Sequence, residues 1–268
     1  MNLFKRVKLS FQARVVRPYM QNHFEKNKYG KQIFSLKNKY KGKKCFFIGN
    51  GPSLKASDLD IIKKNDIPTF AFNRIYNIFD QTNWQPTFYI SQDEKMLQGC
   101  ADVVDKLDLQ YKFIPIQLKW YFDINIHDAI YFNMIGQQCD NPEELKFSKD
   151  IPHGIFNAGT CMYTAAQLAI YMGFTEIYLI GVDHHFQISQ NNKGEIIVDN
   201  SVKDYFTDKY NEDKNNLYIP NTEKSTLTYV AMKKNCDELG IKIYNATRGG
   251  KLEVFPRVSF DEIIKSER

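Results

Sequence analysis

The residues best suited to chemistry form a glycine-rich turn directly after a short apolar stretch. Residues 44–48 read as a strand, and Gly49-Asn50-Gly51-Pro52-Ser53 follows it. Glycine lets a backbone approach a phosphate or sugar closely, and Asn50 offers both a donor and an acceptor. The turn lacks the lysine of a P-loop and, because residue 54 is Leu, the G-x-G-x-x-G spacing. It predicts a ligand-binding turn; a tight strand–helix turn without a ligand is the alternative.

Polar side chains also follow two further apolar stretches. Asn73 and Arg74 come after residues 68–72, and Asp93 with Glu94 comes after residues 87–91. Arginine suits bidentate contacts with phosphate or carboxylate, although a surface salt bridge is the alternative. The two acids suit a ribose hydroxyl or a divalent ion, and otherwise are solvated.

A histidine pair follows the apolar residues 176–180, in the sequence Asp183-His184-His185. Histidine is the usual general base near neutral pH, and an acid beside it sets its tautomer. Neighbouring residues of an extended segment point to opposite sides, so we do not expect the pair to share one metal. We predict His184 or His185, with Asp183, as the catalytic group.

One more polar segment, Asn157-Ala158-Gly159-Thr160, precedes the clearest helical pattern of the chain, at 160–172. The exposed N–H groups of a helix amino terminus bind anions. Thr160 also suits the capping position, and the two roles are compatible.

These clusters share one position relative to the elements. Strands predicted at 44–48, 68–72, 87–91, 112–116, 176–180 and 241–244 alternate with helices, two of them at 160–172 and 224–239. This predicts an α/β, Rossmann-like domain with a mostly parallel sheet and helices on both faces. Ligands of such sheets lie beyond the carboxyl ends of the strands, where every cluster falls. The polar residues 186–224 are predicted to form a lid.

Charge divides the chain into a predicted arm, residues 1–42, and a predicted nucleotide-donor-binding domain, residues 43–268. Residues 1–44 hold thirteen lysines or arginines and one acid, Glu25, a net charge of +12. The other 224 residues hold 23 basic and 30 acidic side chains, a net charge of −7. Such an arm is attracted to anionic surfaces, a membrane leaflet or nucleic acid. We expect the membrane and no nucleic acid; a solvated extension packed partly on the domain is the alternative.

The location expected from the sequence is cytoplasmic, with peripheral contact to the inner face of the membrane. No run of 18 apolar residues and no secretory apolar region is present. The five cysteines form no C-x-x-C pair, which argues against a zinc site or a disulfide framework. No metal site is predicted.

Several of these segments together resemble the bacterial DUF115 (MptE-like) family over roughly residues 43–263. The resemblance rests on Gly49-Asn50-Gly51-Pro52-Ser53-Leu54, Phe72-Asn73-Arg74, residues 176–184 and residues 245–257. Archaeal members are 6-hydroxymethyl-7,8-dihydropterin pyrophosphokinases that use ATP and magnesium. Bacterial members occur with surface-polysaccharide or flagellin glycosylation, and they are similar in fold to family 42 sialyltransferases, which use a CMP-sialic acid donor without a metal.

The resemblance implies that Asn50, Gly51, Ser53 and Asn73 hold the nucleotide. In the direct displacement that we expect, helix amino-terminal amides and Arg74 or Arg248, beside Thr247, stabilise the departing phosphate. This sequence departs from the family 42 sialyltransferases at two points. No arginine precedes Asn157, and residues 186–224 contain no histidine.

We therefore expect a glycosyltransferase of cell-surface glycan synthesis that carries a nonulosonic acid from a CMP-linked donor to a glycan or glycolipid acceptor, without a cofactor. The alternatives are a pterin pyrophosphokinase, with Asp93 and Asp183 holding Mg²⁺, and a non-catalytic binding module.

Overall fold

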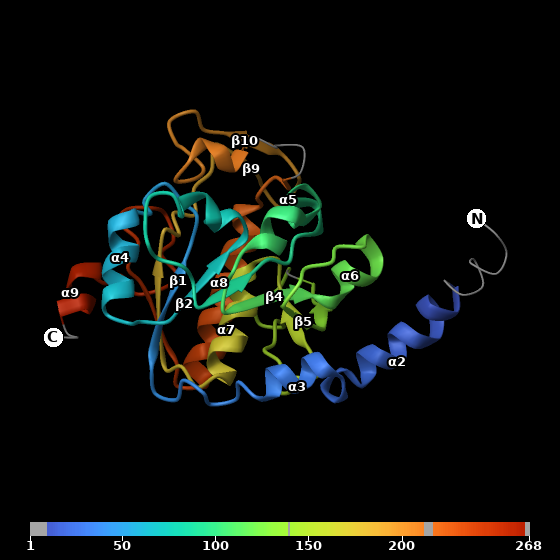
Figure 1. Ribbon diagram of the computed structural model, residues 1–268. Helices are drawn as coiled ribbons and strands as arrows, with labels where there is room; N and C mark the ends of the chain where they lie inside the picture. The colour runs from blue at the N-terminus through green and yellow to red at the C-terminus, as the bar shows by residue number, and fades with distance from the viewer. Residues whose placement is uncertain (1–9, 139, 212–216, 266–268) are drawn as a thin grey trace.

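The computed structural model describes residues 10–138, 140–211 and 217–265. Residues 1–9 of the predicted arm, Cys139 and residues 212–216 of the predicted lid lie outside these described residues. Seven parallel strands form one sheet in the order β11-β8-β1-β2-β3-β4-β5 (Figure 1). Their bounds are Lys44–Ile48 (β1), Thr69–Phe72 (β2), Phe88–Ile90 (β3), Tyr111–Pro115 (β4), Ala129–Phe132 (β5), Glu176–Ile180 (β8) and Lys242–Asn245 (β11).

Helices cover both faces of the sheet, so the predicted Rossmann-like fold class is confirmed. One face packs against α7 (Cys161–Tyr171) and α8 (Thr222–Glu238). The other packs against α4 (Ala56–Lys64), α5 (Glu94–Lys106), α6 (Ile116–Phe122) and α9 (Phe260–Lys265).

The alternation of side chains along β1 supplies both cores. Cys45 and Phe47 belong to the core beneath α7 and α8, whereas Phe46 and Ile48 belong to the core beneath α4 and α5. All four are completely buried. A strand buried on both faces reads as a continuous apolar run, as expected for a parallel sheet.

The N-terminal segment packs on the domain from Phe24 onward. It comprises a π-helical turn η1 (Gln12–Val16), α2 (Arg17–Asn22), a 3₁₀ turn η2 (Phe24–Lys26) and α3 (Lys28–Phe34). Phe24 and Ile33 are fully buried, one in each core. Beyond α3 the backbone runs beside the end of α7, with Tyr40 N donating to Met172 O at 2.8 Å and Gly42 N to Gly173 O at 2.8 Å. Residues 24–42 are thus part of the folded body, while η1 and α2 extend away from it (Figure 1).

Residues 186–224 contain an antiparallel pair, β9 (Ile188–Gln190) and β10 (Ile196–Val198), and a 3₁₀ turn η4 (Asp208–Asn211). Another short parallel pair, β6 (Met134–Gly136) and β7 (Ile155–Asn157), leads into α7. A 3₁₀ helix η3 (Asn73–Ile78) follows β2.

Candidate functional site

A cleft of about 510 Å³ lies at the carboxyl ends of β1, β2, β3 and β8, beside the amino end of α7. Part of the 186–224 segment forms its other side, through residues 204, 205, 210 and 217–221. The structure brings eleven of the seventeen predicted site residues into the lining: Gly49, Asn50, Gly51, Asn73, Asp93, Asn157, Gly159, Thr160, Asp183, His184 and His185. Pro52, Ser53, Arg74, Ala158, Thr247 and Arg248 do not line it.

The glycines of the first turn allow two strand ends to touch. Gly49 N donates to Ile180 O at 2.8 Å, and Gly51 N donates to Gly181 O at 2.8 Å. A Cβ on Gly49 would lie 2.2 Å from Gly181 O, and one on Gly51 would lie 1.9 Å from Asp183 Oδ2. These contacts are far closer than van der Waals packing permits, so the absence of a side chain is required here whether or not a ligand is bound.

Asp183 fastens the same turn from the other strand. Its Oδ2 accepts hydrogen bonds from Ser53 Oγ at 2.7 Å and from Ser53 N at 3.3 Å. Burial raises the pKa of Asp183, and the hydrogen bonds from Ser53 act in the opposite direction. Because its side chain bonds Ser53, Asp183 orients the turn and not a histidine.

Two asparagines present amide groups to the cleft. Asn50 Nδ2 donates to Phe72 O at 3.1 Å, and its buried Oδ1 accepts from no described residue. Asn73, in the left-handed conformation with a φ of 55°, accepts from Ser91 Oγ at 3.2 Å through Oδ1, which leaves Nδ2 as a donor. A buried acceptor without a donor is unfavourable, so Asn50 is suited to a ligand hydroxyl or amine.

The amino end of α7 faces the same space. Gly159 has a φ of 80°, and Thr160 Oγ1 caps the helix by accepting from Met162 N at 3.4 Å. The helix dipole places partial positive charge at this end, which suits a phosphate.

The two histidines have different partners. His184 Nε2 lies 2.8 Å from Thr226 Oγ1, whose own proton is donated to Thr222 O. Nε2 of His184 is therefore the protonated nitrogen. Burial lowers the pKa of His184, which disfavours its cationic form.

His185 is paired with an acid that the sequence did not reveal. His185 Nε2 lies 2.9 Å from Asp199 Oδ2, at the end of β10. The other oxygen of Asp199 accepts from Ser201 N at 2.9 Å, which fixes the carboxylate. A second neighbour, Lys251 Nζ, is 3.4 Å from the same nitrogen; the shorter carboxylate contact has the better geometry for an N–H donor. This arrangement leaves His185 Nδ1 as the proton acceptor.

Both arginines proposed for phosphate are engaged elsewhere. Arg74 is 5% exposed, and its Nη1 donates to Tyr210 O at 2.8 Å. Arg248 forms an ion pair with the buried Asp58 of α4. The buried guanidinium of Arg74 is engaged by Tyr210, a residue of the lining, and the exposed Arg248 is engaged by Asp58 outside the cleft, so neither guanidinium lines the cleft itself.

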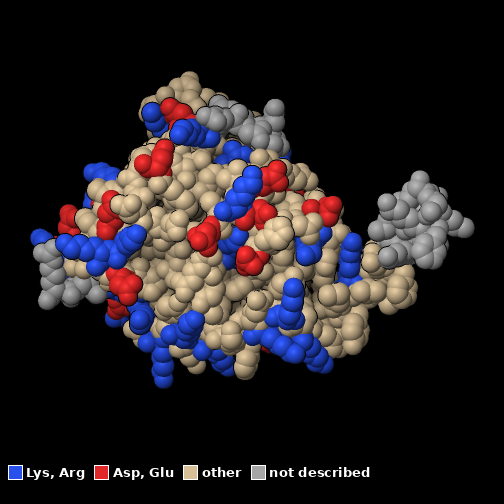
Figure 2. Space-filling view, viewed as in Figure 1, with Lys and Arg blue, Asp and Glu red and all other residues tan. Residues whose placement is uncertain are grey.

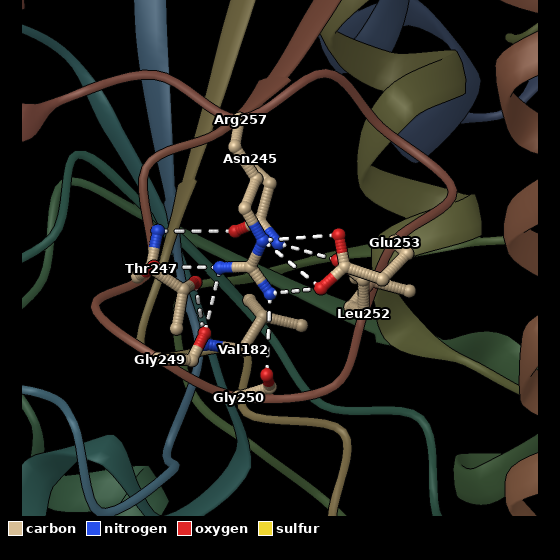
Figure 3. Close-up of polar contacts among 8 residues, drawn as sticks. All are labelled: Val182, Asn245, Thr247, Gly249, Gly250, Leu252, Glu253 and Arg257. Atoms are coloured by element: carbon tan, nitrogen blue, oxygen red, sulfur yellow. Dashed lines mark hydrogen bonds and ion pairs between the residues drawn. The ribbon is translucent and has the colours of Figure 1, made fainter.

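Thr247 supports the cleft from behind, in a loop organised by Arg257 (Figure 3). Thr247 Oγ1 accepts from Val182 N at 3.1 Å. Arg257 donates to Gly249 O at 2.7 Å and to Gly250 O at 3.2 Å, and it pairs with Glu253 at 2.6 Å. This loop holds the end of β8 in place.

Aromatic side chains join the 186–224 segment to the first turn. Phe206 N donates to Asn50 O at 3.1 Å. The rings of Tyr205 and Tyr210 stack with centroids 3.7 Å apart, and both line the cleft. They offer flat apolar surface to a base or sugar.

The described lining carries four carboxylates: Asp93, Glu94, Asp183 and Asp204. Asp93 caps α5, accepting from Met96 N at 3.0 Å, and burial raises the pKa of Asp93. Within the described ranges, no three His, Cys, Asp or Glu side chains converge on a point that could hold a metal ion.

Comparisons with known proteins agree with this architecture. The structure resembles that of the MAf glycosyltransferase from Magnetospirillum magneticum AMB-1, with a TM-score of 0.50 and 16% sequence identity; the likeness covers 89% of this chain and 40% of that one. At this identity the likeness establishes the fold alone. No curated protein matches the sequence. Residues 18–189 match the family described as 6-hydroxymethylpterin diphosphokinase MptE-like. The chain therefore belongs to the MptE-like family.

Proposed function

We propose that the protein is a glycosyltransferase of cell-surface glycan synthesis, which transfers a nonulosonic acid from a CMP-linked donor to a glycan or glycolipid acceptor. The observation that carries the proposal is the polar set around one cleft: the unpartnered Oδ1 of Asn50, the Nδ2 of Asn73 and the amino end of α7. Together they match the hydroxyls, amine and phosphate of a nucleotide. The fold shared with a glycosyltransferase supports the reaction class.

The charge of the lining supports a monophosphate donor. Four carboxylates repel anions. A CMP-linked nonulosonic acid carries one negative charge on its phosphate and one on its carboxylate, and a diphosphate donor of the same sugar would carry a further charge into the same field. Gly159 N already donates to Asn157 Oδ1 at 2.9 Å, so we expect the amino end of α7 from Thr160 onward to bind one phosphate.

The reaction is a direct displacement. The acceptor oxygen attacks the anomeric carbon, the bond from that carbon to the phosphate oxygen breaks, and CMP leaves with the bonding electrons. His185 Nδ1 takes the acceptor proton, and Asp199 stabilises the imidazolium that forms. His184 is the poorer base because burial lowers its pKa.

The family description favours a second candidate, a pterin pyrophosphokinase. The carboxylates of Asp93 and Asp183 line the cleft and are oxygen ligands of the kind that Mg²⁺ takes together with substrate phosphates. In that reaction an oxygen of the pterin attacks a phosphorus of ATP. The two candidates differ in nucleotide and in metal dependence.

Thermal unfolding with CMP, CDP, UDP, GDP and ATP, each in EDTA and in Mg²⁺, tests the proposal. A ligand at about 100 times its dissociation constant adds about 2.7 kcal/mol of stability. We expect CMP to raise the melting temperature in EDTA as much as in Mg²⁺. Stabilisation by ATP with Mg²⁺ and none by CMP would reject the transferase and favour the pyrophosphokinase.

A further inference from the structure

The first described helix of the chain carries an apolar stripe that the body does not cover. Phe11, Val15 and Tyr19 are four residues apart, so they lie on one side of η1 and α2. Their exposed fractions are 58%, 50% and 64%. η1 and α2 contribute no buried residue.

Two aromatic side chains of α6 are exposed as well. Tyr121 and Phe122, at the end of α6, are 53% and 43% exposed. The guanidinium of Arg17 lies 4.7 Å from the centroid of the Tyr121 ring and links α2 to α6. Because Arg17 is two residues from both Val15 and Tyr19, this contact lies on another side of the helix from the stripe. We call Phe11, Val15 and Tyr19 the aromatic face.

Basic side chains flank the aromatic face and follow it along the chain. Arg14 is exposed beside the stripe, and exposed lysines continue through α3 and the segment after it: Lys26, Lys28, Lys31, Lys37, Lys39, Lys41 and Lys43. Glu25 is the one acid among residues 10–44. Figure 2 shows Lys and Arg gathered along the lower edge of the molecule, where α3 runs in Figure 1.

We propose that the aromatic face docks on an anionic lipid membrane. A helix of this length is not stable in water without a partner for its apolar side. An anionic lipid membrane binds both the apolar stripe and the basic side chains. Tyrosine and phenylalanine settle at the headgroup boundary, and basic side chains pair with anionic headgroups. Nucleic acid would leave the apolar stripe in water, and a second copy would place two basic segments against each other. Among the described residues, no helix is long and apolar enough to cross a bilayer.

Flotation of the full chain with vesicles tests the proposal independently of the enzymatic reaction. We expect binding to phosphatidylcholine vesicles that contain phosphatidylglycerol, little binding to pure phosphatidylcholine, and release by high salt. Phe11→Ser with Val15→Ser and Tyr19→Ser should abolish flotation. Arg14→Gln with Arg17→Gln should weaken it about 25-fold, at about fivefold per basic side chain.

Lys193→Gln with Lys203→Gln, which removes two exposed lysines near the β9–β10 pair, is the matched control and should float like the wild type. Thermal unfolding without ligand, measured on every variant, shows whether the domain remains folded. The proposal is overturned if the wild type fails to float with anionic vesicles, if the control loses as much binding as the arginine variant, or if the wild type is a dimer that the serine variant dissociates.

Discussion

The strand-end wall of the cleft, residues 49–53 and 181–183, is tied together by backbone hydrogen bonds, whereas the 186–224 segment that closes the cleft exposes apolar side chains. In the wall, two amide-to-carbonyl contacts of 2.8 Å join β1 and β8, and a Cβ on either glycine would clash. In the segment, Ile196, Ile197 and Val198 are 53%, 48% and 57% exposed. The segment is held to the body by contacts such as Phe206 N to Asn50 O and Arg74 to Tyr210 O.

This difference suggests a division of work between binding and reaction. The strand-end wall carries Asn50, one of the polar groups proposed to hold the nucleotide, and its geometry is fixed before any ligand arrives. The 186–224 segment carries Asp199, which orients the proposed base. Changes in the segment should therefore alter turnover, and changes in the wall should alter affinity and stability.

The largest expected effect is that of His185→Asn. Removing a general base lowers kcat by about 10²–10⁴-fold. The affinity for CMP should stay close to the wild-type value, because the wall is untouched. CMP release from a CMP-linked donor measures kcat, and calorimetry measures affinity. His184→Asn is the matched comparison; an equal loss of kcat in both variants would contradict the assignment of His185.

Asp199→Asn should also lower kcat, by no more than His185→Asn does, because the amide no longer stabilises the imidazolium. The same assay measures this loss. If Asp199 acts only through His185, the variant that combines His185→Asn and Asp199→Asn should be no slower than His185→Asn alone. If the two losses of kcat multiply in the combined variant, Asp199 has a different role.

Gly49→Ala tests the wall. The new Cβ would lie 2.2 Å from Gly181 O, so the two strand ends must separate. We expect the free energy of unfolding to fall by about 1–3 kcal/mol, as for other overpacked sites, together with a loss of CMP affinity. Urea unfolding measures the first and calorimetry the second. Gly136→Ala, where the Cβ meets nothing within 4 Å, is the control; equal effects of the two substitutions would refute the packing argument.

The smallest effect concerns pH. Burial lowers the pKa of His184 in the folded state relative to its ordinary value of 6.5. As the pH falls through 6.5, the unfolded chain takes up the proton first, so stability decreases on the acid side. Urea unfolding between pH 8 and about 5 should show a shallower decrease for His184→Asn than for the wild type. Parallel curves would mean that His184 contributes no such linkage.

The fold was predictable where the periodic pattern of apolar residues extends over many residues. The helix at 160–172 and the strand at 176–180 combine strong periodicity with a terminating glycine, and α7 and β8 lie there. β5, β6 and β7 were not predicted, because no described helix lies between them and the alternation of strand and helix that marks the other strands is missing there.

The sequence predicted the part of the cleft that follows from the topology of the parallel sheet. Asn50, Asn73 and Asp183 meet because parallel strands end at the same edge. Arg74 could not be placed, since the carbonyl that accepts from it lies 136 residues away in the chain. Asp199 lies in a polar stretch without periodicity, so its pairing with His185 emerges only from the fold of the 186–224 segment.

The central claim is that the strand-end wall binds CMP without a metal, and its most direct test is a calorimetric titration of CMP in EDTA into the wild type and Asn50→Ala. The account predicts binding to the wild type, weakened about tenfold in the variant by loss of one hydrogen bond to the ligand. An absence of CMP binding to the wild type, or an unchanged affinity in Asn50→Ala, would contradict it.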